Sequence, residues 1–80
     1  MKATVLVRPK EGILDPQGEA VHGSLRALGF AVSGARVGRI VDLELEATDR
    51  AGARAEVERM CAELLANPLI ESVEIQLEQA

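Results

Sequence analysis

The chain has 80 residues, of which 48% are hydrophobic and 28% charged, and its formal net charge is −4 at pH 7. These values fit one small folded domain over residues 1–80 and argue against disorder, because the apolar fraction is high and the net charge modest. No apolar run approaches the ~20 residues that span a bilayer, and the first residues do not resemble a secretory signal. The single cysteine, Cys61, excludes an internal disulfide and fits a reducing compartment, so we expect a cytoplasmic protein.

Charge and aromatic content also argue against nucleic-acid binding. Nine Lys and Arg residues face thirteen Asp and Glu residues, and Phe30 is the only aromatic residue. Binding to phosphates requires a basic surface, and binding to single strands requires aromatic side chains on which bases stack. A domain of this size is only marginally stable when alone, so oligomerisation is one expected source of further stability.

The first half of the chain predicts a strand followed by a helix. Apolar and polar residues alternate over 2–8, which is typical of a strand with one buried face. Asp15 and Pro16 suit the N-cap and the first position of a helix, and Gly29 suits its end. One apolar stripe runs along this helix: Val21, Leu25, Leu28.

The second half predicts two further strands and a second helix. Residues 30–37 suggest a short strand or an irregular extended segment, and residues 41–47 alternate strictly between apolar and acidic side chains. An alanine-rich helix follows Asp49 and ends at Asn67, because the residue before a proline is disfavoured in a helix. Residues 70–77 form the last strand.

This order, strand–helix–strand–strand–helix–strand, predicts an α+β fold. We expect an antiparallel sheet of three to four strands with both helices on one face, as in a ferredoxin-like fold or a variant of it. The other face is then either solvated or a docking surface. It would carry Thr4, Leu6, Arg8, Asp42, Glu44, Glu46, Glu74, Gln76 and Glu78.

The chemical inventory offers no complete active site. His22 is the only histidine, and Ser24 is two residues away, a spacing that points the two side chains apart on a helix. Cys61 falls in the apolar stripe of the second helix, which favours a buried, inert thiol. One Cys and one His are too few for a structural zinc site, and no glycine-rich phosphate-binding motif is present. We therefore expect no catalytic, metal-binding or cofactor-binding residue in this chain.

Two short stretches are more distinctive. Residues 12–18 form a loop that exposes Ile13 and Leu14 just before the helix cap, and this pair could instead close the helix start as a hydrophobic staple. Arg36 and Arg39 flank Gly38, which suggests either an exposed turn or a contact for carboxylates or phosphates of a partner.

With three other segments, these stretches resemble PurS, the small-subunit family of phosphoribosylformylglycinamidine synthase, also called formylglycinamide ribonucleotide amidotransferase. The resemblance runs from the first strand to the last. It is carried by Gly12-Ile-Leu-Asp-Pro-Gln-Gly18, Leu28-Gly-Phe30, Arg36-Val-Gly-Arg39, Leu43-Glu-Leu-Glu46 and Leu64-Leu-Ala-Asn-Pro-Leu-Ile70.

The resemblance implies a role in the fourth step of purine biosynthesis. In this family a glutaminase subunit releases ammonia from glutamine, and a large synthetase subunit uses ATP and magnesium to activate the amide that ammonia attacks. The small subunit, as a dimer or a dimer of dimers, links the two and assists ammonia transfer without catalysing a step. A sheltered route is valuable because ammonia in water at neutral pH is mostly protonated and no longer nucleophilic.

The resemblance also implies which residues contact the partner subunits. They are Asp15, Gln17 and Gly18 at the start of the first helix, and Arg36, Gly38 and Arg39 before the second long strand. On this view Arg39→Glu would weaken assembly and leave the fold intact. A dimeric ligand-sensing module of the ACT-like kind remains an alternative from another functional class, and a thermal-shift screen against amino acids and nucleotides would separate the two.

Overall fold

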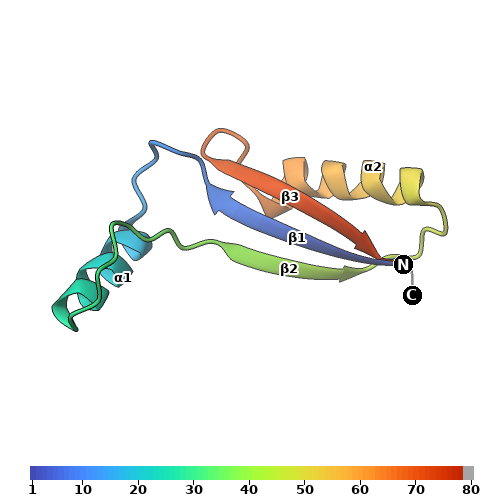
Figure 1. Ribbon diagram of the computed structural model, residues 1–80. Helices are drawn as coiled ribbons and strands as arrows, with labels where there is room; N and C mark the ends of the chain where they lie inside the picture. Colours follow the sequence, from blue (N-terminus) through green and yellow to red (C-terminus); the bar gives the residue numbers. More distant parts are fainter. Residues whose placement is uncertain (79–80) are drawn as a thin grey trace.

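The computed structural model describes residues 1–78 and contains three strands and two helices (Figure 1). The elements are β1 Lys2–Pro9, α1 Pro16–Ala27, β2 Arg39–Glu44, α2 Arg50–Met60 and β3 Glu71–Glu78; a π-helical turn, η1, extends α2 over Cys61–Leu65. The predicted α+β class with an antiparallel sheet and two helices is confirmed. Residues 30–37 take the irregular extended form, so the sheet has three strands.

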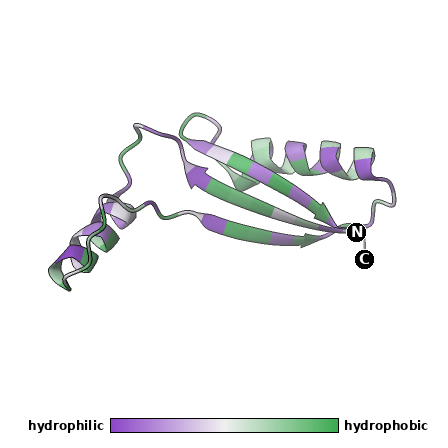
Figure 2. Cartoon of the chain, in the orientation of Figure 1, coloured by the Kyte–Doolittle hydropathy of each residue, from purple (hydrophilic) through white to green (hydrophobic). Residues whose placement is uncertain are grey.

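Strand β1 lies at the centre of the sheet. The order is β2-β1-β3, and both neighbours run antiparallel to β1. Val5 pairs with Val41 on one side and with Ile75 on the other, so the apolar positions of all three strands share one face. The predicted alternation therefore gives the observed register, and Figure 2 shows it as alternating hydrophobic and polar bands along the strands.

Helix α2 covers the apolar face of the sheet and packs mainly against β3. Val5 and Val7 of β1 and Val57 of α2 are fully buried, and Cys61 is 5% exposed. The partly buried residues around this small core are Val41, Leu43, Leu45, Leu65, Ala66, Ile75 and Leu77. The buried position predicted for Cys61 is confirmed, and burial raises the pKa of its thiol.

Both helices begin at the predicted cap residues. The Asp15 carboxylate accepts a hydrogen bond from the Gly18 N–H at 3.0 Å, and Asp49 accepts one from the Gly52 N–H at 2.7 Å. Helix α1 is followed by Gly29 with φ +97°, the left-handed conformation that glycine adopts without strain.

The prediction that both helices cover one face is wrong for α1. Figure 1 shows α1 beyond the end of the sheet, and within residues 1–78 it makes no extended contact with the strands or with α2. The molecule is consequently elongated, 48 × 27 × 14 Å, with a radius of gyration of 15.8 Å. A compact chain of 80 residues would have a radius of about 12 Å. The apolar stripe of α1 therefore lies open, with Leu28 75% exposed and Val21 41% exposed.

The second face of the sheet carries no helix, as the pattern predicts. Thr4 pairs with Asp42 and Gln76 across this face, and its hydroxyl donates a hydrogen bond of 3.1 Å to the Asp42 carboxylate. Leu6 lies between Ile40 and Glu74 one step further along.

Candidate functional site

Most of the predicted partner-contact residues lie close together, between the end of the sheet and the start of α1. We call residues 16–37, which comprise α1 and the segment that returns from it, the arm. Asp15, Gln17, Gly38 and Arg39 line one cavity of about 240 Å³ at the base of the arm, together with the start of β3. Residues far apart in the sequence are thus brought to one place, although their side chains have different roles there.

Asp15 connects the two chain segments that enter and leave the arm. One carboxylate oxygen caps α1 through the Gly18 N–H, and the other accepts a hydrogen bond of 2.8 Å from the Val37 N–H. These bonds, the one from Val37 first, hold the pKa of Asp15 below its ordinary value of 3.8. A nearby positive charge on Arg36 acts in the same direction. Asp15 therefore fixes the base of the arm.

Two glycines permit close approach of the backbone at the same place. A Cβ on Gly18 would lie 2.4 Å from the Ala35 carbonyl oxygen, and a Cβ on Gly38 would lie 2.2 Å from the Val7 carbonyl oxygen. Both distances are far below van der Waals contact. Gly18 and Gly38 are required by the fold, independently of any partner.

The returning segment is held against α1, so the arm is one unit. The Val32 carbonyl oxygen accepts a hydrogen bond of 2.9 Å from Arg26, and the His22 Nε2 atom lies 3.1 Å from the same oxygen. The Phe30 N–H donates to the Leu25 carbonyl oxygen at 3.0 Å. His22 thus contacts the returning backbone, a role the sequence did not predict.

Arg39 forms a network that joins β2, η1 and β3. Its guanidinium donates to both carboxylate oxygens of Glu71, at 2.7 and 3.1 Å, and also to the Leu65 carbonyl oxygen. Glu71 accepts a further hydrogen bond of 2.8 Å from the Asn67 N–H. The paired groups raise the pKa of Arg39 and lower the pKa of Glu71, in each case chiefly through their shared hydrogen bond. This arginine is engaged within the chain, whereas the sequence predicted that it would face a partner.

Gln17 and Arg36 are exposed members of the predicted set, and within residues 1–78 their side chains form no hydrogen bond or ion pair. Arg36 shares a larger groove with Arg8, a residue that sequence reasoning placed on the open face and did not assign to a site. Arg8 follows Leu6 on the same face of β1, and only the pairing of β1 with β2 brings it beside the Arg36–Arg39 stretch.

Acid should weaken the fold through Asp15 and Glu71. Since their pKa values are lower in the folded chain, the unfolded chain binds protons more readily. Their contribution is therefore complete above the ordinary values of 3.8 and 4.5 and is lost as the pH falls through the folded values. We expect the melting temperature to fall between about pH 6 and about pH 3, with a shallower fall for Asp15→Asn. Glu56→Gln, which removes an exposed carboxylate of α2, should keep the steeper slope.

Residues 1–78 contain neither a metal-binding cluster nor a membrane-spanning helix. No group of three His, Cys, Asp or Glu side chains is arranged to hold a metal ion. Neither helix is long and apolar enough to cross a bilayer.

Comparison with known proteins identifies the family. The model of the family described as "PurS: Phosphoribosylformylglycinamidine (FGAM) synthase" matches residues 2–79. The chain belongs to the PurS family. It is 38% identical to the PurS subunit of Methanocaldococcus jannaschii over 98% of this chain and 95% of that protein. It is 41% identical to the subunit of Archaeoglobus fulgidus over 94% and 95% of the two chains.

Solved PurS structures share the fold. The crystal structure of M. jannaschii PurS superposes with a TM-score of 0.87 at 38% identity and covers 99% of this chain and 96% of its own. A chain of the structure described as PurLQS from Thermotoga maritima gives a TM-score of 0.85 at 34% identity, covering 94% and 93%. PurS proteins are subunits of phosphoribosylformylglycinamidine synthase in purine biosynthesis, and this membership favours the subunit interpretation over a ligand-sensing module.

Proposed function

We propose that this chain is a non-catalytic bridging subunit of phosphoribosylformylglycinamidine synthase. It links the glutaminase subunit to the ATP-dependent synthetase subunit and assists the transfer of ammonia between them. The observation that carries the proposal is the similarity over 94% of this chain to a chain of the T. maritima PurLQS structure, in which PurS is one part of a larger assembly.

The shape of the chain supports a bridging role. The sheet with α2 lies at one end of a molecule 48 Å long, and the arm lies at the other end. Exposed apolar side chains occur at both ends: Leu28 and Phe30 on the arm are 75% and 58% exposed, and Leu64 beside α2 is 85% exposed. Two separated apolar surfaces allow two simultaneous contacts: the arm can contact a second copy of this chain while the surface beside α2 stays free for another subunit.

The chemistry explains why such a link is valuable. In the proposed complex the glutaminase releases ammonia, and the synthetase consumes ATP with magnesium to convert the amide oxygen into a leaving group that ammonia displaces. Ammonia that escapes into water at neutral pH becomes ammonium, which has no lone pair for the attack. Docked subunits shorten the route and exclude water from it.

The arm further supports a homodimer. In a four-stranded ferredoxin-like sheet a strand lies beside β2 and a second helix covers the β2 side of the core. Here residues 30–37 and α1 lead away from that position, which leaves Val41, Leu43 and Leu45 only half-buried. The arm of a second copy could fill this position, because residues 30–37 have the composition of a strand and α1 carries an apolar stripe. Two chains that exchange arms would therefore each complete a sheet.

The two sheet edges differ in a way that agrees with this dimer. Arg50 and Arg54 of α2 donate hydrogen bonds of 3.4 and 3.2 Å to the outer carbonyl oxygens of Leu77 and Ile75 on β3. Within residues 1–78 no comparable bond reaches the outer backbone of β2. An uncovered edge favours pairing with another strand.

The dimer predicts a mass in solution of about twice 8.5 kDa by multi-angle light scattering. Leu28→Ser should shift the mass toward the monomer, because Leu28 is exposed in one chain and would be buried by exchange. Leu64→Ser, which alters an equally exposed leucine away from the arm, is the control. A monomeric native protein, or equal behaviour of the two variants, would contradict the exchange of arms.

Assembly of purified subunits tests the bridging role. In size-exclusion chromatography with glutamine, ATP and magnesium, we expect the glutaminase to co-elute with the synthetase only when this chain is present. Co-elution in its absence, or elution of this chain by itself, would reject the bridge.

A further inference from the structure

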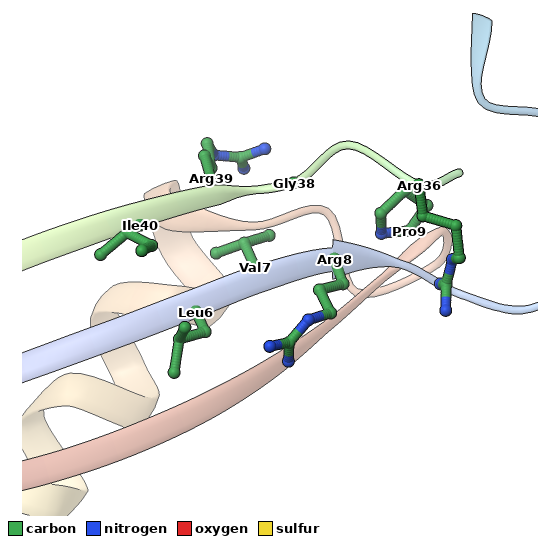
Figure 3. Close-up of a pocket in the computed structure, with 8 residues that line it drawn as sticks. All are labelled: Leu6, Val7, Arg8, Pro9, Arg36, Gly38, Arg39 and Ile40. Carbon is green, nitrogen blue, oxygen red and sulfur yellow. The ribbon is translucent and has the colours of Figure 1, made fainter. Parts of the chain in front are cut away.

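A groove of about 620 Å³ opens beside the base of the arm, on the sheet face that no helix covers. Leu6 of β1 and Ile40 of β2 provide an apolar floor, and Ile40 is 62% exposed. Arg8 and Arg36 stand at the rim. Figure 3 shows their side chains extending on the same side as Leu6, whereas Arg39 extends to the opposite side of the sheet.

The two rim arginines are available to a ligand. The Arg8 guanidinium lies 3.6 Å from the Glu74 carboxylate, but both side chains are more than half exposed, so water screens this pair. Arg36 is exposed, and within residues 1–78 it forms no ion pair. Arg39, by contrast, is committed to Glu71.

Positive charge is concentrated here on an otherwise acidic protein. Three of the nine basic residues line the groove: Arg8, Arg36 and Arg39, of which Arg39 is paired with Glu71. The far end of the same sheet face carries Asp42, Glu44 and Glu78. A chain with net charge −4 thus presents one basic groove with an apolar floor.

We propose that this groove docks an acidic segment of another subunit of the synthase, with carboxylates on Arg8 and Arg36 and an apolar side chain on Leu6 and Ile40. The proposal rests on the bridging function and names the surface and the partner chemistry. Arginine around an apolar centre is typical of protein interfaces. A phosphate ligand fits less well, because the groove is broad and is not built on a helix N-terminus or a glycine-rich loop.

Charge reversal at one rim position tests the groove. With this chain immobilised, Arg36→Glu should raise the dissociation constant for one of the two other subunits about ten-fold, and the native interaction should weaken with added salt. Arg59→Glu makes the same change in charge on the exposed side of α2, where the side chain is 78% exposed, and should bind as the native chain does.

A second variant tests the floor without changing charge. Ile40→Ser should also weaken binding. Because this change alters no charge, its effect cannot come from general electrostatic attraction. It also cannot come from a disturbance of Asp15, which lies near Arg36. Native affinity in both variants would overturn the proposal while leaving the bridge intact, and loss of the dimer mass would assign the groove to a second copy instead. If the native chain binds neither subunit, the bridging function fails first.

Discussion

Gly38→Ala should destabilise the chain by about 2 kcal/mol or more, since overpacking against rigid backbone costs roughly 1–3 kcal/mol. The added methyl group would lie 2.2 Å from the Val7 carbonyl oxygen and 3.3 Å from the Arg8 Cα atom, and neither can move without disturbing the pairing of β1 with β2. Chemical denaturation followed by circular dichroism measures the change. For a domain of this size, each kcal/mol lowers the melting temperature by roughly 4–8 °C.

Gly34→Ala is the matched control for this substitution. A Cβ on Gly34, only four residues away, has nothing within 4 Å. We expect its stability to stay within about 0.5 kcal/mol of the native value, as is usual for surface substitutions. Equal stabilities of the two variants would show that β1 and β2 do not approach as closely as the structure has them.

Arg39→Glu should lower the melting temperature of the isolated chain by about 5 °C or more, independently of any effect on assembly. The new carboxylate would face Glu71, and the Leu65 carbonyl oxygen would lose its donor, so β2, η1 and β3 would no longer be joined. Like charges at this distance repel, whereas the native pair is bidentate and therefore strong for a surface interaction. Differential scanning calorimetry measures the shift.

The double variant Arg39→Glu with Glu71→Arg distinguishes this network from a partner contact. Reversing both charges restores opposite signs and should recover part of the lost melting temperature. Arg59→Glu, whose native partner Glu63 is 4.0 Å away and well exposed, should change the melting temperature little. If Arg39→Glu leaves the melting temperature unchanged but abolishes assembly, Arg39 contacts a partner subunit, as the sequence suggested.

Local signals in the sequence predicted the elements of the fold well. The alternation in 2–8 and 41–47 reflects a sheet with one buried face, and Asp15 and Asp49 each cap a helix as expected. The buried position of Cys61 followed from its place in an apolar stripe. These features depend on neighbours within a few residues, which a pattern can encode.

The place of α1 could not be predicted in the same way. Its stripe of Val21, Leu25 and Leu28 indicates that one side of the helix needs an apolar partner, but it does not say whether that partner is the same chain or another. Residues 30–37 have the composition of a strand, yet a strand forms only where a neighbouring strand is available. Both features agree with completion by a second chain.

The structure brings together residues from the two predicted contact stretches, and their contact with a partner stays a prediction. Asp15, Gln17, Gly38 and Arg39 do meet at the base of the arm. The engagement of Arg39 could not be predicted, because Glu71 is 32 residues away and such long-range pairs leave no local pattern. Arg8 was missed for the same reason, since it joins Arg36 only after β1 and β2 have paired.

The most direct test of the bridging role compares two nitrogen sources in a synthase reconstituted from the glutaminase and synthetase subunits. We expect turnover with glutamine to depend on this chain and turnover with a high concentration of ammonia to proceed without it, because free ammonia needs no transfer between subunits. If glutamine-dependent turnover is the same with and without the chain, the bridging role is wrong.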